Sequence, residues 1–170
     1  DMLLQEADRL IEKMGERKTI AIGVAIPGPY NIRRGRIELM TGFPGWGDIA
    51  IQEELEQKFH IPVFVGHDAN AGVLAQYWHN MEDVGNRPGE IMVYIAVGQG
   101  IGAGIICDGE LIKGNLGIAG EIGHMSINFN GPRCSCGNYG CLENYCSSIA
   151  FTNEINRVMG GDHEYTFSEA

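Results

Sequence analysis

Positively charged residues are scarce in this chain. Its 170 residues include 12 Lys and Arg against 22 Asp and Glu, which gives a formal net charge of −10. Proteins that bind nucleic acid without sequence preference need clustered Lys and Arg to neutralise phosphates. The basic run Arg33-Arg34-Gly35-Arg36 falls in a predicted turn and is more typical of a solvated loop. We therefore expect this segment not to hold DNA itself.

Long apolar runs, repeats and low-complexity tracts are also missing. The longest apolar run extends from Ile91 to Val97, far short of the roughly 20 residues that span a bilayer. Asp1-Met-Leu-Leu-Gln-Glu has no basic segment ahead of an apolar one, so it does not resemble a signal peptide. The 44% hydrophobic content is ordinary for a globular protein. We expect a cytoplasmic protein with no membrane partner.

Hydrophobic spacing predicts an α/β protein. Before residue 88, helices and strands alternate, which favours an α/β layer with a parallel component. The predicted elements are a helix over 2–15, strands over 19–26 and 36–39, a helix over 49–59 with Asp48 as its N-cap, a strand over 62–65, and an apolar helix from the Asp68 region to about residue 80.

Arg87-Pro88-Gly89 breaks this pattern and is the predicted boundary between two lobes, 1–88 and 89–170. The second lobe should contain a strand over 90–97, a hairpin at Asp108-Gly109, a cysteine-rich loop and a helix over about 142–159. The chain opens on a helix and stops before a second full sheet. We therefore expect both ends to be cut from a longer protein.

One imidazole and three thiols lie within eighteen residues, at His124, Cys134, Cys136 and Cys141. A Cys₃His set fills all four positions of a tetrahedral zinc ion, as structural zinc sites require, and thiolates favour zinc or iron over magnesium or calcium. Disulfides are less favoured because the five cysteines are odd in number and Cys134 and Cys136 are close. The alternative is a group of ordinary buried or free cysteines.

A glycine-rich run occupies residues 98–104, with Gly98, Gly100 and Gly102 in alternate positions. Gly98, Gly100 and Ala103 fit a dinucleotide pattern, but that pattern must open a helix, and the following residues favour a β-hairpin. Bare backbone amides in such a turn can still cradle phosphate. A tight turn without a ligand is the alternative.

Three acidic residues stand near these motifs. Asp68 follows a buried strand, where it could act as a general base for a sugar hydroxyl or as a helix N-cap. Glu121 precedes His124 by three residues, and Glu143 follows Cys141 by two. With one ring nitrogen of His124 on a metal, the other becomes an N–H donor, and the set suits a polyhydroxylated ligand. Otherwise Glu121 is solvated and Glu143 is a favourable first-turn acid.

These residues resemble the ROK family, named for repressors, open reading frames and kinases. The central match is Gly120-Glu121-Ile-Gly-His124 followed by Cys134-x-Cys136-Gly-Asn-Tyr-Gly-Cys141-Leu-Glu143. Four further pieces fit in order and extend the resemblance over residues 19 to about 150: Ala25-Ile-Pro-Gly28-Pro, Phe43-Pro-Gly-Trp46, His67-Asp68-Ala-Asn and Val97-Gly-Gln-Gly-Ile-Gly-Ala-Gly104.

The resemblance implies the two-lobed actin-like, ribonuclease-H-like sugar kinase fold, with sugar held between the lobes. It implies that His124, Cys134, Cys136 and Cys141 bind structural zinc. The implied sugar-site residues are Gly28, Thr41, His67, Asp68, Glu121, His124 and Glu143. It also implies a homo-oligomer.

Two departures from the family pattern bear on function. His67 replaces the usual Asn before the catalytic Asp, which alters one hydroxyl contact. Gln99 replaces the Thr of kinase members, and its longer side chain in the phosphate loop should hinder ATP. We therefore favour the sugar-binding domain of a transcriptional regulator, with DNA contact delegated to an upstream domain outside these residues. The alternative is an ATP- and Mg²⁺-dependent sugar kinase with Asp68 as general base.

Overall fold

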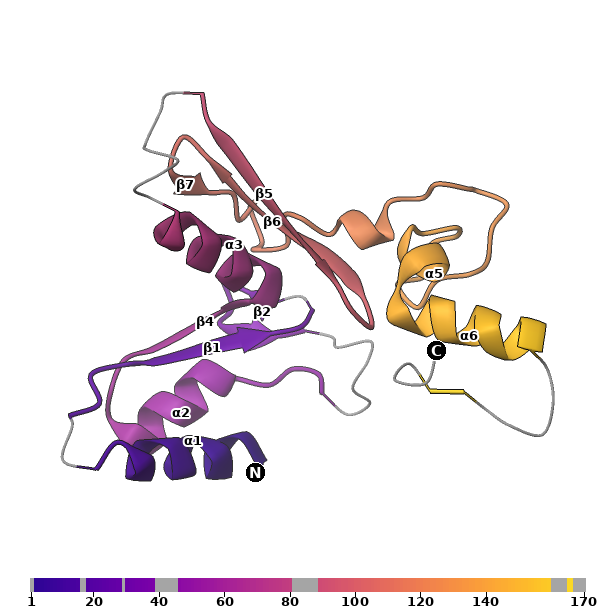
Figure 1. The fold of residues 1–170 in the computed structure, drawn as a ribbon. Coiled ribbons are helices and arrows are strands. Elements are labelled where there is room, and N and C mark those ends of the chain that lie inside the picture. The colour runs from indigo at the N-terminus through magenta and orange to yellow at the C-terminus, as the bar shows by residue number, and fades with distance from the viewer. Residues whose placement is uncertain are drawn as a thin grey trace. The chain divides into compact units, whose positions relative to one another are not determined.

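The structure is a computed structural model that describes residues 2–15, 18–28, 30–38, 46–80, 89–159 and 165–166. Its residues group into two units, Asp1–His67 and Asp68–Ala170. Figure 1 labels their helices and strands.

The first unit is an α/β layer. Its central strands, β1 (Ile22–Ile26) and β4 (Val63–His67), pair in parallel, with Ile22 opposite Val63 and Ile26 opposite His67. The parallel component predicted from the alternation of helices and strands is therefore confirmed. The remaining elements are α1 (Met2–Lys13), α2 (Ile51–Phe59) and a short antiparallel pair, β2 (Tyr30–Asn31) with β3 (Arg36–Ile37).

A single cluster of apolar side chains forms the core of this unit. Ile37, Leu55 and Val63 are at most 2% exposed, and they come from β3, α2 and β4. Leu3, Leu4 and Ala7 of α1 pack against the same cluster. The apolar stripes of both helices thus face one core, which is why the 3.6-residue periodicity located them correctly.

The predicted N-cap of α2 is wrong. The helix begins at Ile51 with Ala50 as its N-cap residue and without a side-chain capping hydrogen bond. Asp48 instead adopts a φ of 56° and accepts a hydrogen bond of 2.7 Å from Nε of Arg36. Pairing with a guanidinium across the chain thus replaces the local cap that the sequence suggested.

The second unit is built on an antiparallel hairpin. β5 (Ile91–Val97) and β6 (Ile101–Cys107) pair along their whole length, and β7 (Glu110–Leu111) continues the sheet from β6. Helix α3 (Asp68–His79) packs on both long strands. At Gly104 a Cβ would lie 2.2 Å from the carbonyl oxygen of Ala69, so helix and strand backbones are nearly in contact.

The packing of α3 assigns this helix to the second unit. Helix α3 groups with β5 and β6, and the second unit begins at Asp68. The breaking residues Arg87 and Pro88 lie outside the described residues.

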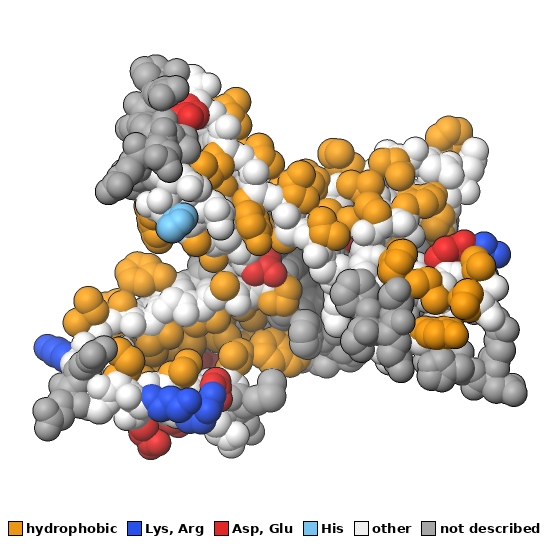
Figure 2. Space-filling model, viewed as in Figure 1, with side chains coloured by type: hydrophobic (Ala, Val, Ile, Leu, Met, Phe, Trp, Pro, Cys, Tyr) orange, Lys and Arg blue, Asp and Glu red, His pale blue; other side chains and the backbone are white. Residues whose placement is uncertain are grey.

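One side of β5 faces outward. Ile91, Val93, Ile95 and Val97 are 52–65% exposed, while the intervening residues are less exposed. Figure 2 shows apolar side chains at the surface along this hairpin. The strict alternation means that α3 covers one face of the hairpin, and that nothing among the described residues covers the other.

The predicted helix over 142–159 is two helices. α5 (Glu143–Cys146) is followed by Ser147, whose backbone is extended, and α6 (Ser148–Met159) begins immediately afterwards. The buried Ser147 hydroxyl accepts a hydrogen bond of 3.1 Å from the N–H of Ala150. Ser147 therefore caps α6, which explains the break.

Bilayer crossing by a helix is not observed in the described ranges. The longest helices there have 12 residues, and none combines the length and apolar character that such a span requires.

Candidate functional site

The segment that carries His124 lies directly on strand β6. Its 3₁₀ turn, η1 (Ile122–His124), follows Gly120, whose carbonyl accepts a hydrogen bond of 2.7 Å from the N–H of Ala103. A Cβ at Gly120 would lie 1.9 Å from the Ala103 oxygen, and a Cβ at Gly123 would lie 2.2 Å from the Ile101 oxygen. Glycine at both positions therefore lets the chain lie against the strand.

The three cysteines lie on a tight loop. The N–H of Gly137 donates to the carbonyl of Cys134 at 3.0 Å, and the N–H of Cys134 donates to the Asn138 carbonyl at 2.8 Å. Gly137 has a φ of 93° and Gly140 a φ of 61°, a region that favours glycine. This turn brings the side chains of Cys136 and Cys141 together, although the two residues are five positions apart in the sequence.

The four side chains predicted to bind a metal converge. One donor atom from each of His124, Cys134, Cys136 and Cys141 lies within 4.8 Å of the others. The Cys136 and Cys141 sulfurs are 3.8 Å apart, and the Cys134 sulfur is 3.6 Å from Nδ1 of His124. Tetrahedral zinc with bonds of about 2.3 Å to sulfur and about 2.1 Å to nitrogen separates two sulfur ligands by about 3.8 Å and a sulfur from a nitrogen by about 3.6 Å. The donor set therefore fits a tetrahedral metal.

The thiols do not ionise alike. Burial opposes ionisation of Cys134, but hydrogen bonds from the Cys136 backbone and neighbouring side chains outweigh it and lower the Cys134 pKa to about 7. Burial and the two neighbouring cysteines raise the pKa of Cys141 to about 12. A thiolate at Cys134 makes ionisation of the adjacent Cys141 harder, because like charges this close repel.

His124 presents its other ring nitrogen to a carboxylate. Nδ1 faces Cys134, whereas Nε2 lies 3.9 Å from Oε2 of Glu121, and both side chains are partly exposed, at 27% and 28%. This separation is too long for a direct hydrogen bond. One hydroxyl oxygen about 2.8 Å from each atom could accept from Nε2–H and donate to the carboxylate.

Glu143 contacts the glycine turn between β5 and β6. Its Oε2 accepts a hydrogen bond of 3.0 Å from the N–H of Ile101, the first residue of β6. At the other end of the turn, the N–H of Ser148 donates to the carbonyl of Gly98 at 2.8 Å. Glu143 is also the first residue of α5. It is thus a first-turn acid, as one alternative held, and it reaches a distant strand as well.

The glycine motif forms a hairpin turn, as the rejection of a dinucleotide fold predicted. The turn comprises residues 98–100, closed by a hydrogen bond of 2.9 Å from the N–H of Gly98 to the Gly100 carbonyl. Gly102 lies within β6, opposite Ala96. Of the three glycines expected in a phosphate loop, two are in the turn and one is in the strand.

The remaining predicted sugar-site residues are distributed between the units. Asp68 is the first residue of α3, and its Oδ1 accepts a hydrogen bond of 2.7 Å from the N–H of Ala69. His67 ends β4 and Gly28, with a φ of 96°, follows β1, so both belong to the first unit. Thr41 lies outside the described residues. Asp68, Glu121, His124 and Glu143 all belong to the second unit.

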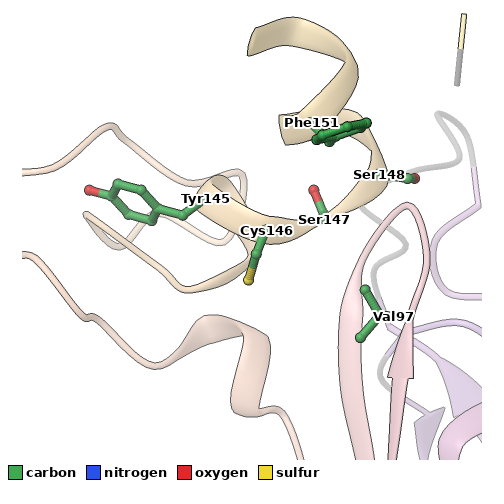
Figure 3. Close-up of a pocket in the computed structure, with 6 residues that line it drawn as sticks. All are labelled: Val97, Tyr145, Cys146, Ser147, Ser148 and Phe151. Carbon is green, nitrogen blue, oxygen red and sulfur yellow. The ribbon is translucent and has the colours of Figure 1, made fainter. Parts of the chain in front are cut away.

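A separate pocket of about 310 Å³ opens beside α5 and α6. Val97 lines it from the end of β5, and the other lining residues are Tyr145, Cys146, Ser147, Ser148 and Phe151 (Figure 3). Tyr145 points away from Val97 in this view. None of the predicted sugar or metal residues lines this pocket, which is therefore distinct from the Cys₃His cluster.

Two contacts of this region were not anticipated from the sequence. The Glu143–Ile101 hydrogen bond joins residues 42 positions apart, and the Ser147 cap lies in what appeared to be a continuous helix. Ser147 itself was the local sequence signal for the helix break. Serine is a common N-cap residue, whose hydroxyl accepts from the backbone N–H three residues later.

Known proteins resemble the whole of this chain. The model of the ROK family matches residues 1–169. The xylose repressor of Caldicellulosiruptor bescii is 37% identical over 142 residues, which are 82% of this chain and 34% of the repressor. The chain thus spans about a third of the length of that relative.

Solved structures of two functional classes match equally well. A ROK family transcriptional regulator, a homologue of the E. coli MLC protein, superposes with a TM-score of 0.73 at 32% identity, covering 95% of this chain and 40% of that one. The ROK hexokinase from Thermus thermophilus has the same TM-score of 0.73 and 32% identity, covering 99% and 53%. The predicted actin-like, ribonuclease-H-like α/β fold of this family is confirmed, and the chain belongs to the ROK family.

Proposed function

We propose that this chain is the sugar-binding part of a ROK-family transcriptional regulator, supported by a structural zinc ion. The observation that carries the proposal is the position of His124. Its Nδ1 faces the three cysteines, and its Nε2 faces Glu121 at 3.9 Å. His124 is therefore part of the candidate metal cluster and, together with the Glu121 carboxylate, part of a site that suits a hydroxyl group.

His124, Cys134, Cys136 and Cys141 would hold the ion. Bound zinc would fix the tautomer of His124 and stabilise the loop. His124 then donates from Nε2–H to a sugar oxygen, and Glu121 accepts from a sugar hydroxyl. The family resemblance adds Asp68 and Glu143 as further acceptors. A hydrogen bond from a neutral hydroxyl to an ionised carboxylate is stronger than one between two neutral groups.

DNA contact belongs to another part of the regulator in this proposal. The net charge of −10 is unsuited to a phosphate-binding surface. The xylose repressor is about three times the length of the matched region, which leaves room for a DNA-binding domain. Sugar binding would shift the balance between conformations of a cytoplasmic homo-oligomer and so change its DNA affinity.

Calorimetric titration of the intact protein with xylose, glucose and N-acetylglucosamine tests the proposal. We expect one of these sugars to bind, and we expect Glu121→Ala to abolish that binding. Glu110 is an exposed residue on β7, so the control variant Glu110→Ala should still bind the sugar. Removal of the metal should weaken binding as well. Equal sugar affinities in wild type and Glu121→Ala would show that Glu121 does not bind the sugar and would refute the proposed site.

An ATP-dependent sugar kinase is the second candidate. The equal similarity to the Thermus thermophilus hexokinase and the position of Asp68 at the start of α3 favour it. Asp68 would take the hydroxyl proton, and Mg²⁺ would neutralise the phosphates. Gln99, at the centre of the glycine turn, weighs against this candidate.

A further inference from the structure

The glycine turn is held at both ends by the segment that follows the cysteine loop. Ser148 donates its N–H to the Gly98 carbonyl at 2.8 Å, and Glu143 accepts the N–H of Ile101 at 3.0 Å. All of these residues belong to the second unit. The turn is therefore fixed by one main-chain contact and one carboxylate.

The Glu143 carboxylate contacts the turn through a backbone N–H group. Backbone N–H groups at a glycine-rich turn attract the oxygens of phosphate, and Glu143 supplies a negatively charged oxygen to one of these groups. A Cβ on Gly100 would lie 2.8 Å from the same Oε2 atom. The carboxylate thus lies over the part of the turn that has no side chain.

We propose that Glu143 is a built-in anion that closes the glycine turn to phosphate ligands. A phosphate oxygen and the Glu143 oxygen cannot both accept from the Ile101 N–H, and their like charges repel at this distance. Phosphate enters the turn only when Glu143 leaves it. This inference rests on the Glu143–Ile101 contact alone and does not depend on sugar binding or on DNA binding.

Amide hydrogen exchange at Ile101, followed by NMR without sugar or nucleotide, tests the contact. We expect exchange on the order of tenfold faster in Glu143→Ala, because a charge-assisted hydrogen bond is lost. Gly100→Ala should have a similar effect, since its new methyl group displaces only the end of a flexible side chain. Gly23→Ala, on β1 of the first unit, is the control, because a Cβ there meets nothing within 4 Å.

Titration with inorganic phosphate, followed at the Ile101 amide signal, tests the exclusion of anions. We expect phosphate to bind several-fold more tightly to Glu143→Ala than to wild type. Glu110→Gln removes one negative charge elsewhere and should leave the phosphate affinity unchanged. Equal exchange in wild type and both variants, or equal phosphate affinity, would overturn the proposal. Tighter binding in Glu110→Gln would also do so, because net charge would then explain the gain.

Discussion

The sulfur atoms of Cys136 and Cys141 lie 3.8 Å apart, which is almost twice the length of a disulfide bond and matches the ligand spacing around tetrahedral zinc. The cysteines are therefore free and face a common point. Because Cys141 is fully buried and Cys136 is exposed, this point lies at the edge of the fold.

Metal content is the first testable consequence. We expect about one zinc per chain in the purified protein, and Cys136→Ser should lower both the zinc content and the midpoint of thermal unfolding, because metal binding stabilises the folded loop. Elemental analysis and calorimetry measure the two effects. Cys146→Ser, at an exposed cysteine outside the cluster, serves as the control and should retain the metal.

Two glycines of the cysteine loop should respond very differently to alanine. A Cβ at Gly140 would lie 1.7 Å from the Asn128 oxygen, whereas a Cβ at Gly137 meets nothing within 4 Å. Both have positive φ, so each substitution costs about 1–3 kcal/mol in strain. Gly140→Ala adds a backbone collision and should also release the metal. Similar unfolding free energies and zinc contents for the two variants would contradict this loop geometry.

The capping role of Ser147 predicts a smaller effect. Ser147→Ala removes the acceptor of the Ala150 N–H and should lower the free energy of unfolding by about 1 kcal/mol, as for other lost N-caps. Ser148→Ala keeps the main-chain bond to Gly98 and should cost less. Chemical denaturation of both variants measures the difference, and an equal loss would argue against a cap at Ser147.

ATP turnover separates the two candidate functions. With a panel of hexoses and Mg²⁺, we expect the intact protein to show no detectable sugar phosphorylation, because Gln99 extends from the turn that would have to approach phosphate. Robust phosphorylation that disappears in Asp68→Asn would establish the kinase and refute the regulator. A coupled assay of ADP release measures the rate.

Local patterns made the helices and the cysteine cluster predictable. The apolar stripe that includes Leu55 has helical spacing, and the stripe alone determines which side of α2 faces the core. The metal ligands lie within eighteen residues, so their convergence depends mainly on one loop. A parallel component of the sheet could be predicted because helices and strands alternate along the sequence.

The missed features depend on contacts between distant residues. Asp48 could not be recognised as the partner of Arg36, because a carboxylate can either cap a helix or pair with a guanidinium, and the sequence does not show which role it takes. The place of α3 in the second unit depends on the close approach of Gly104 to Ala69. Similarly, the Glu143 carboxylate reaches Ile101 only because the cysteine loop returns the chain to β6. No periodicity in sequence encodes these three relationships.

The backbone contacts of Gly120 and Gly123 with β6 have a consequence for how the site tolerates change. Two main chains that touch have no side chain between them to absorb a displacement, so we expect a shift of the strand at Ala103 to displace Glu121 and His124 as well. Substitutions buried under β6 could therefore alter metal and ligand affinity without touching either group. Variants that affect the site should be sought in the hairpin as well as in the loop.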